Sequence, residues 1–399
     1  MPRLLDEVGA TVRWRKMDDD GFDVLVFPDF RFPIPANRET YQARLTEMFP
    51  AEKSGIDKYM RLLREVERLG SAKPGVGLVF EALLRGRLAA SWKGGTIGDF
   101  LEQNIEDPRC RAVILGQNGD YGLAPKQVSA MLHCGLANHY FKGAYYPEGG
   151  GQVIADQLAA IVERQGGVVA LRRPVTGILV EGGRAVGATG EGFAVRAPVV
   201  VSNADIKKTV LELLPGDSVP AAWTKKAQDW QMGGAIFLAC FGVRGPIEGL
   251  GARNLWQFDD YDFDAGYRRL SEATEGATMG CYVTSASTKD PGSRGHAPEG
   301  YSSIEVMTMV PGAAEAWGLE PGAESALRYR QDSRYRAIKQ RVEDDLLRRL
   351  DVLLPGTATR VEFRESATPV THSRYTGASD GTGYGLAATP AQFLDRRPG

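Results

Sequence analysis

The stretch GGGQVIADQLAAIVERQGG, residues 149–167, joins a glycine turn, an amphipathic run and a glycine stop. Its apolar residues recur at helical spacing, which predicts a helix over Gln152–Arg164 with one stripe facing inward. Gly166 and Gly167 supply the backbone freedom with which helices commonly end. The inward stripe consists of Val153, Ile154, Leu158, Ile161 and Val162. We therefore expect this helix to cover one face of a sheet.

Short runs with strand character follow this helix. They are VVALR (168–172), Val175–Val180, RAVGAT (184–189) and FAVR (193–196), with tight turns at Glu181–Gly183 and Gly190–Gly192 between the later ones. The next run, PVVVS (Pro198–Ser202), lacks polar alternation, which is typical of a strand buried on both faces of a parallel sheet. Together they predict an α/β unit whose sheet another part of the protein must complete.

The regions on either side have a different pattern. Phe22–Pro35 alternates and turns like a hairpin, and Ile56–Leu69 predicts an amphipathic helix. Pro74–Leu88 is also amphipathic, and we interpret it as a core-facing helix, with a membrane-touching surface as the alternative. Thr96 and Asp99 fit a capping box that begins a further helix.

Longer apolar runs occur after Pro215. Gly234–Val243, Met279–Ser285 and Ser303–Val310 predict a separate, largely antiparallel sheet. Tyr335–Leu354 predicts a helix that buries one stripe. This stripe contains Tyr335, Ile338, Val342, Leu346 and Leu350.

Composition limits the class of protein. A chain of 399 residues with 43% hydrophobic and 25% charged residues suits a soluble globular protein of two domains. The net charge of -2 gives no electrostatic case for nucleic acid as a partner. The four cysteines form no C-x-x-C pair, so we expect reduced thiols in a cytoplasmic setting. No apolar run reaches the ~20 residues that a bilayer requires.

Motifs for several chemistries are missing from the sequence. It contains no G-x-G-x-x-G, no phosphate-binding P-loop and no G-x-S-x-G elbow. His133, Cys134 and His139 are close in sequence but would point in different directions on a helix, so we expect no metal site. Gly149–Gly151 precedes a helix, but no strand feeds it, so it is only a weak signal for an anion.

Longer segments carry a family resemblance. ANHYFKGAYYPEGGGQVIADQLAAIVERQGG (137–167), followed by RRPVTGILVEGGRAVGA and VVVSNAD, resembles the middle of the phytoene desaturase superfamily, in particular retinol saturase and carotenoid isomerase. Further stretches agree in the same order, and the likeness covers nearly the whole chain. They are LLDEVGA, FPAEKSGIDKYMRLL (49–63), TSASTKDPGSRGHAPEG (284–300) and ESATPVTHSRYTGASDGTGYGL (365–386).

The resemblance implies a fold of class α/β plus α+β. A partial FAD-binding, Rossmann-like domain of the glutathione reductase or amine oxidase type would accompany a substrate domain of antiparallel sheet and helices. The expected segments are 1–20 (end of an N-terminal FAD-domain segment), 21–140 (substrate domain, hairpin and helices), 141–215 (middle FAD-domain segment), 216–365 (substrate domain, sheet and helix) and 366–399 (return toward the FAD domain).

The same resemblance suggests that the chain is incomplete at both ends. Family members begin with a strand, a glycine-rich turn and a helix that bind the ADP part of FAD, and they end with a second glycine-rich segment. Neither segment is found in this sequence. The alternative to an incomplete chain is a naturally shortened relative of the family. We therefore expect Pro198–Ser202 to expose apolar surface and promote aggregation, because its neighbours would lie in the missing part.

The activity implied is that of an FAD-dependent oxidoreductase, a saturase, desaturase or isomerase acting on carbon–carbon double bonds of a carotenoid- or retinoid-like polyene. NAD(P) is considered as electron donor or acceptor. By matching to the family, Val175 would offer main-chain groups to the adenine, and Ser202, Asn203 and Ala204 would run beside the cofactor.

Protein side chains do not carry hydride, so their expected work is to orient the substrate and to manage protons. The candidates are His139, Lys142, Tyr145, Tyr146 and Glu148, for each of which packing or surface charge is an equal alternative. Other functions stay open at this point: a non-catalytic remnant, a hydrophobic-ligand binding protein, or an amine-oxidase-like flavoenzyme. The expected partner is a hydrophobic polyene and not nucleic acid, while membrane contact and oligomeric state are open.

Overall fold

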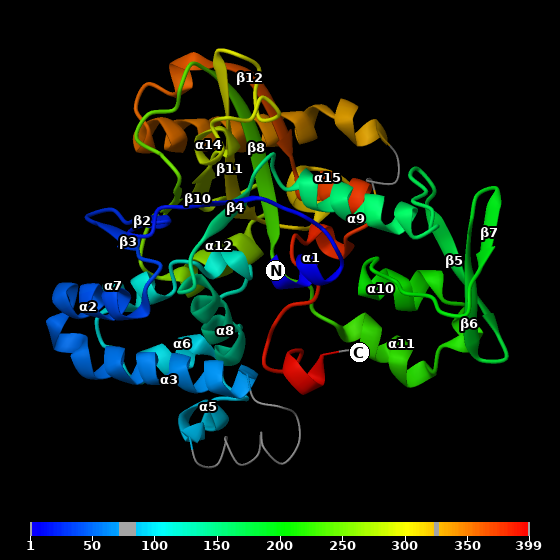
Figure 1. The fold of residues 1–399 in the computed structure, drawn as a ribbon, viewed down its shortest axis with the longest axis horizontal. Coiled ribbons are helices and arrows are strands. Elements are labelled where there is room, and N and C mark those ends of the chain that lie inside the picture. Colours follow the sequence, from blue (N-terminus) through cyan, green and yellow to red (C-terminus); the bar gives the residue numbers. More distant parts are fainter. Residues whose placement is uncertain (1, 72–84, 323–326, 398–399) are drawn as a thin grey trace.

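A seven-stranded sheet forms the centre of the molecule. The computed structural model describes residues 2–71, 85–322 and 327–397. The sheet has the order β12-β8-β11-β10-β9-β2-β3 (Figure 1). Its strands are β2 (Asp23–Val26), β3 (Arg31–Ile34), β8 (Ala235–Arg244), β9 (Asn254–Gln257), β10 (Met279–Thr284), β11 (Tyr301–Val310) and β12 (Val361–Ala367). Neighbouring strands are antiparallel except β2 and β9, which run parallel. The predicted hairpin and the predicted antiparallel strands are thereby confirmed.

One face of this sheet is covered by the long helix α14 (Ser333–Leu353). Strand β8 alternates buried and half-buried residues, so that Phe237 and Phe241 lie in one apolar cluster with the helix. The predicted stripe of α14 is buried throughout, with Leu346 and Leu350 fully inaccessible. The sequence pattern therefore identified both partners of this interface.

The other face meets a set of helices from the first half of the chain. These are α2 (Arg38–Met48), α3 (Lys53–Ser71), α5 (Arg87–Ser91), α6 (Ile97–Glu102), α7 (Pro108–Ile114), α8 (Ala130–Tyr140) and, from later in the chain, α12 (Phe263–Glu272). Trp256 and Phe258 join them in one apolar cluster. Thr96 caps α6 through the amide of Asp99, which confirms the predicted start of this helix, and the carboxylate of Asp99 accepts from the Thr96 hydroxyl. Most of the amphipathic segment Pro74–Leu88 lies outside the described residues.

A small meander stands at one end of the molecule, away from the large sheet (Figure 1). It consists of β5 (Val175–Glu181), β6 (Arg184–Gly190) and β7 (Phe193–Arg196) in that order. Helix α9 (Gln152–Arg164) precedes it with the predicted bounds. The prediction that its apolar stripe faces inward is wrong, because no residue of α9 is buried and Val162 is 44% exposed.

The strands predicted at 168–172 and 198–202 are also not formed. A β-strand exists only by hydrogen bonding to a neighbour, and no described segment pairs with either run. Val199 and Val201 are 71% and 87% exposed, so the predicted exposure of Pro198–Ser202 is confirmed although its strand is not. The α/β unit therefore keeps an open flank.

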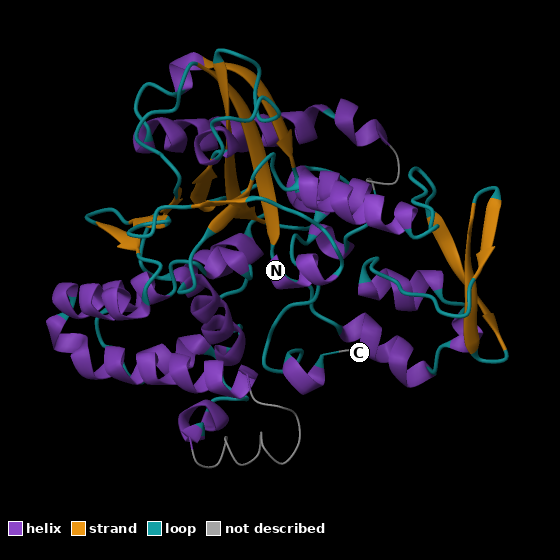
Figure 2. Ribbon diagram, in the orientation of Figure 1, coloured by secondary structure: helices purple, strands orange, loops and turns teal. Residues whose placement is uncertain are grey.

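Shorter elements link these parts (Figure 2). They are α1 (Pro2–Glu7), β1 (Trp14–Lys16), β4 (Tyr145–Pro147), α10 (Ile206–Lys208), α11 (Ala221–Asp229), α13 (Ala286–Lys289) and α15 (Pro369–Thr376). Strands β1 and β4 form an antiparallel pair. None of the helices in the described part of the chain has the length and apolar character needed to span a membrane.

Candidate functional site

A cavity of about 240 Å³ lies beside the large sheet, on the side of the helices from the first half of the chain. Most of its wall is apolar. This part is formed by Ile236, Trp256, Phe258, Met279, Met307 and Met309. Methionines adapt their shape to a ligand at little cost, and aromatic rings stack on conjugated chains. The wall thus suits a flat, apolar molecule.

One part of the wall is polar and comes from a 3-10 turn, Asn118–Asp120. Asp120 Oδ2 accepts a hydrogen bond from the hydroxyl of Tyr140 at 2.9 Å. Burial, and next the nearby charge of Asp23, raise the pKa of Asp120 to about 7. The cavity therefore combines a largely apolar wall with a carboxyl group that changes protonation near neutral pH.

Behind this turn lies a chain of buried polar groups. Asp23 accepts hydrogen bonds from Asn254 Nδ2 and Gln117 Nε2, both at 2.7 Å, while burial raises its pKa. Asn254 Oδ1 accepts from the hydroxyl of Thr284 at 2.9 Å, and that hydroxyl accepts from Lys289 Nζ. Burial lowers the pKa of Lys289 to about 8. These groups link the sheet to the segment 284–300 that carried the family resemblance.

The glycine turn before α9 is held by the same segment. The amide of Gly149 donates to Asp290 Oδ2 at 2.8 Å, and Asp290 also binds Arg15 Nε at 2.6 Å and His296 Nε2 at 3.1 Å. Burial alone would raise the pKa of Asp290, but these hydrogen bonds outweigh it and lower the pKa. Gly149 has a φ of 85°, a conformation that L side chains rarely adopt, so glycine is required there.

Two of the predicted catalytic candidates lie in this polar cluster. Tyr146 packs beneath the ammonium of Lys289, 5.4 Å from its ring centre, and Glu148 pairs with Arg13 Nε at 2.9 Å and Arg15 Nε at 3.6 Å. The other three candidates, His139, Lys142 and Tyr145, are exposed. Lys142 forms an ion pair with Glu67 at 3.4 Å. The structure brings none of the five to the cavity wall, and their catalytic roles stay predictions.

His133, which we did not expect to bind metal, has tyrosine partners. Its ring nitrogens lie 3.0 Å from Tyr59 Oη and 3.1 Å from Tyr121 Oη. Burial lowers the pKa of His133 to about 4. Within residues 2–71, 85–322 and 327–397, no group of three or more His, Cys, Asp or Glu side chains could hold a metal ion.

Sequence reasoning missed Asn118, Asp120, Asp23 and Lys289. The signal for Lys289 was available, because it lies in the quoted segment TSASTKDPGSRG. Asn118 and Asp120 occur in a short NGD turn of ordinary composition, and only the fold places that turn against β9 and β10.

The four residues predicted to bind the cofactor lie at the two ends of the meander in the chain, Val175 at the start of β5 and Ser202, Asn203 and Ala204 after β7. Val175 begins β5, which pairs only with β6 in the described chain, and is 43% exposed. Ser202 shares a hydrogen bond with the hydroxyl of Thr209 at 2.8 Å, and Asn203 and Ala204 are exposed. The free edge of β5 has main-chain donors and acceptors of the kind that the resemblance assigns to the adenine of FAD. For the pyrophosphate, the sequence holds no glycine-rich turn between a strand and a helix.

Comparison with known proteins gives both relatives and a fold. No family model matches the chain. An all-trans-retinol 13,14-reductase from Danio rerio is 28% identical, over 96% of this chain and 66% of its own length. A neurosporene-forming phytoene desaturase from Cereibacter sphaeroides is 28% identical, over 88% and 66%. A chloroplastic prolycopene isomerase from Arabidopsis thaliana is 25% identical, over 86% and 56%.

These homologues confirm the resemblance seen in the sequence. The chain spans 66% of the length of the retinol reductase and of the phytoene desaturase. The expectation that it is incomplete, and the segment boundaries, stay predictions.

Solved structures confirm the fold class. An oxidoreductase from Methanosarcina mazei superposes with a TM-score of 0.56 at 16% identity, over 98% of this chain and 83% of that one. A putrescine oxidase variant superposes with a TM-score of 0.55 at 14% identity, over 97% and 74%. At such identities the likeness establishes the fold and leaves the chemistry to the site.

Proposed function

We propose that this chain is part of an FAD-dependent oxidoreductase that acts on carbon–carbon double bonds of a carotenoid- or retinoid-like polyene. The observation that carries the proposal is the cavity, with its methionines and aromatic rings beside one half-buried carboxyl group, that of Asp120. The retinol reductase, phytoene desaturase and prolycopene isomerase relatives support this substrate class.

FAD and the side chains of the protein would perform different parts of the reaction. When bound, FAD supplies the hydride transfer that no side chain of this protein can perform. Residues of the chain have other tasks: Trp256 and Phe258 hold a conjugated chain flat, and Met307 and Met309 adapt to its shape. Asp120 is the titratable group in the cavity wall, and its proton stays on the carboxyl in the lower part of the neutral range.

The cofactor would be held in part by the open flank of the meander. Val175 would offer main-chain groups to the adenine, and the short side chains of Ser202, Asn203 and Ala204 would allow close approach. Their exposure in the described chain supports this assignment. No similarity supports NAD(P), so the proposal names FAD alone. Cytoplasmic location and peripheral membrane contact remain predictions.

The test combines flavin binding with a product assay. The purified 399-residue chain is titrated with FAD by calorimetry. It is then incubated with all-trans-retinol and a chemical reductant, and the masses of the products are measured by mass spectrometry. We expect bound flavin and a product heavier by two hydrogens, or a shifted double bond for an isomerase. A chain that binds FAD but converts amines instead, with peroxide release, would contradict the proposed substrate class.

A variant pair locates the cofactor. Ala204→Trp fills the space beside the predicted cofactor path and should weaken FAD binding at least 10-fold. Val195→Trp introduces the same bulky side chain at another exposed position, on β7. It should leave FAD binding unchanged. Equal effects of the two variants would contradict the assignment of this flank.

A further inference from the structure

A row of polar side chains crosses four neighbouring strands of the large sheet. Asp23 of β2 lies opposite Asn254 of β9, and Thr284 of β10 lies opposite Glu305 of β11. Lys289, from helix α13, donates a hydrogen bond from Nζ to the Thr284 hydroxyl. Asp23 and Lys289 are 3% and 8% exposed, and Glu305 is half-buried. Charged groups are almost never buried without a partner, so these three must stabilise one another.

The hydrogen bonds of Asp23 are those of a carboxylate. Its Oδ1 accepts from Asn254 Nδ2 and its Oδ2 accepts from Gln117 Nε2, both at 2.7 Å. Burial raises the pKa of Asp23, while these hydrogen bonds and the charge of Lys289 lower it. Burial lowers the pKa of Lys289 to about 8, so its ammonium group is still charged at pH 7. Two N–H donors and a nearby cation favour the ionised form of Asp23.

The carboxyl group of Asp120 has different surroundings. The hydroxyl of Tyr140 donates to its Oδ2 at 2.9 Å, and no described group donates to its Oδ1. Oδ1 keeps some exposed surface, and Asp120 lines the cavity. Burial, and next the charge of Asp23, raise the pKa of Asp120 to about 7. Asp120 therefore has an oxygen that is free to carry a proton.

The buried acids outnumber the buried bases. Lys289 acts on Asp23 and on Glu305, and His296 also acts on Glu305. Among the described residues, no cation shifts the pKa of Asp120. A buried carboxyl group without a cation keeps its proton more readily than one with a cation. The position of Lys289 thus determines which acid is the anion and which acid is protonated.

We propose that Lys289 is a positioning residue that holds Asp23 as the anion and thereby keeps the proton on Asp120. Lys289 is not part of the cavity wall, and it reaches Asp23 through the Thr284 hydroxyl and the Asn254 amide. The carboxylate of Asp23 then opposes a second negative charge on Asp120. The use of this proton on a polyene rests on the proposed function, whereas its location does not.

The proposal predicts the reverse of a direct charge effect. Loss of a cation raises the pKa of a carboxyl group that it faces directly. Lys289→Met should instead lower the pKa of Asp120, because Asp23 then takes up the proton and no longer opposes an anion on Asp120. We expect the midpoint of Asp120 to fall from about 7 by roughly 1 pH unit. Lys289→Arg keeps the charge and should keep the midpoint.

Infrared difference spectroscopy measures this titration in the full chain, without FAD or substrate. Protonated carboxyl groups absorb at a higher frequency than carboxylates, and the band that is lost in Asp120→Asn belongs to Asp120. Glu305→Gln is the matched control, because it removes the other carboxyl group beside Lys289 and should leave the midpoint of Asp120 unchanged.

The tyrosines around these groups do not titrate in the same range, because burial raises their pKa. They are Tyr121, Tyr140, Tyr282 and Tyr384 beside Asp120, and Tyr146 beside Lys289. The neutral range therefore reports the carboxyl groups.

A double variant tests the route through Asp23. Asp23→Asn removes the opposing charge and should lower the midpoint of Asp120 as Lys289→Met does. The combination of both should lower it no further, because Lys289 acts on Asp120 through Asp23. Thr284→Val interrupts the hydrogen-bonded route and should give a smaller fall in the same direction, even if the methionine variant folds poorly.

Failure of this proposal can be distinguished from failure of the proposed function. A midpoint that rises in Lys289→Met, or that stays unchanged there and in Thr284→Val, would overturn the positioning role and leave the polyene function intact. The expected shifts in a chain that converts no polyene would support the location of the proton and refute the proposed function.

Discussion

Helices α14 and α9 have the same kind of sequence and different surroundings. Both carry an apolar stripe at helical spacing. The stripe of α14 is buried against β8 and β11, whereas α9 has no buried residue. The periodicity of a sequence therefore predicts a helix and its apolar side, but burial depends on a sheet that the chain must also supply.

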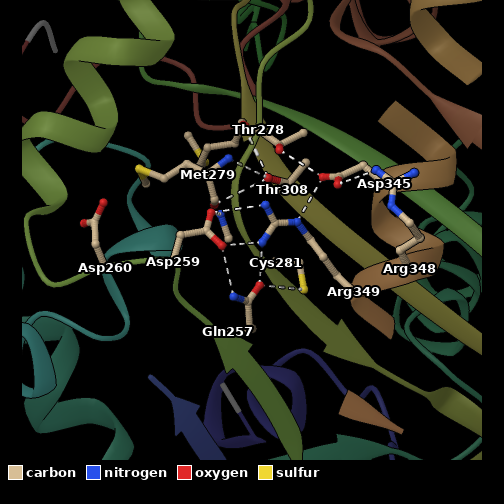
Figure 3. A network of polar contacts seen from close by, with 12 residues as sticks. Gln257, Asp259, Asp260, Thr278, Met279, Cys281, Thr308, Asp345, Arg348 and Arg349 are labelled. Atoms are coloured by element: carbon tan, nitrogen blue, oxygen red, sulfur yellow. Dashed lines mark hydrogen bonds and ion pairs between the residues drawn. The ribbon is translucent and has the colours of Figure 1, made fainter. Parts of the chain in front are cut away.

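The polar contacts of α14 also differ from those of the meander. Arg349 of α14 binds Asp259 Oδ1 at 2.5 Å, Gln257 Oε1 at 2.8 Å and Asp345 Oδ2 at 2.9 Å, which ties the helix to the end of β9 (Figure 3). In the meander, the ion pair of Arg196 with Glu181 is exposed. Three pairs of variants and one double variant test the difference between the packed and the open region.

The largest difference is expected for leucine truncations. Leu346→Ala in α14 removes a side chain with no exposed surface and should lower the free energy of unfolding by about 2–5 kcal/mol. Leu158→Ala in α9 removes a side chain that is 39% exposed and should cost less than about 0.5 kcal/mol. Urea unfolding measures both, and equal losses would show that α9 is buried in solution.

Acid should act on the packed region through His133. Its pKa is lowered to about 4 in the fold, so the unfolded chain binds more protons between pH 6.5 and 4. This contribution to stability is complete above pH 6.5 and is lost as pH falls toward 4, on the order of 3 kcal/mol. Asp120, whose pKa is raised to about 7, acts in the opposite direction: it favours folding as pH falls below 7.

Melting temperatures against pH separate these effects. His133→Gln should flatten the loss of stability between pH 6.5 and 4. Glu181→Gln in the meander, where Arg196 lowers the pKa of Glu181 from 4.5, should leave the profile above pH 4.5 unchanged. An unaltered slope in His133→Gln would contradict the assignment to this histidine.

A smaller effect is expected for the arginines. Arg349→Met removes hydrogen bonds to three partners and should cost about 1–3 kcal/mol of unfolding free energy. Arg196→Met breaks an exposed pair and should stay within about 0.5 kcal/mol. Thermal denaturation of the two single variants compares them directly, and a similar loss in both would refute the contrast.

The smallest change in stability is expected on the open flank. Val199→Lys combined with Val201→Lys replaces two exposed apolar side chains and should alter the unfolding free energy by less than about 0.5 kcal/mol. It should nevertheless reduce aggregation, because contiguous apolar surface promotes association. Light scattering tests this, and a wild-type chain that stays monodisperse would contradict it.

Local patterns predicted much of this fold. A long apolar run identified β8, capping residues identified the start of α6, and glycines marked the bounds of α9. Apolar character also suggested strands at 168–172 and 198–202, which are absent because a strand needs a neighbour that local sequence does not reveal.

The site was less accessible from sequence for the same reason. Asn118 and Asp120 acquire their role by lying against Trp256 and Tyr282, from strands more than a hundred residues away in the chain. Tyr146 and Glu148 were found through the family motif, yet the structure places them with Arg15 and Lys289 and not in the cavity. The chemistry of a single residue can be recognised in the sequence. Only the fold shows which of these residues lie close together in space.

The parallel pairing of β2 with β9 also governs how the protein assembles. Asp23 and Asn254, hydrogen bonded across this pair, are 231 positions apart. During synthesis the hairpin of β2 and β3 leaves the ribosome long before β9 does. The edge of β2 that later pairs with β9 therefore stays unpaired in the meantime. Closing so long a loop slows folding more than it weakens the final state. Chaperone dependence and slow recovery from denaturant are the expected signs of this late closure.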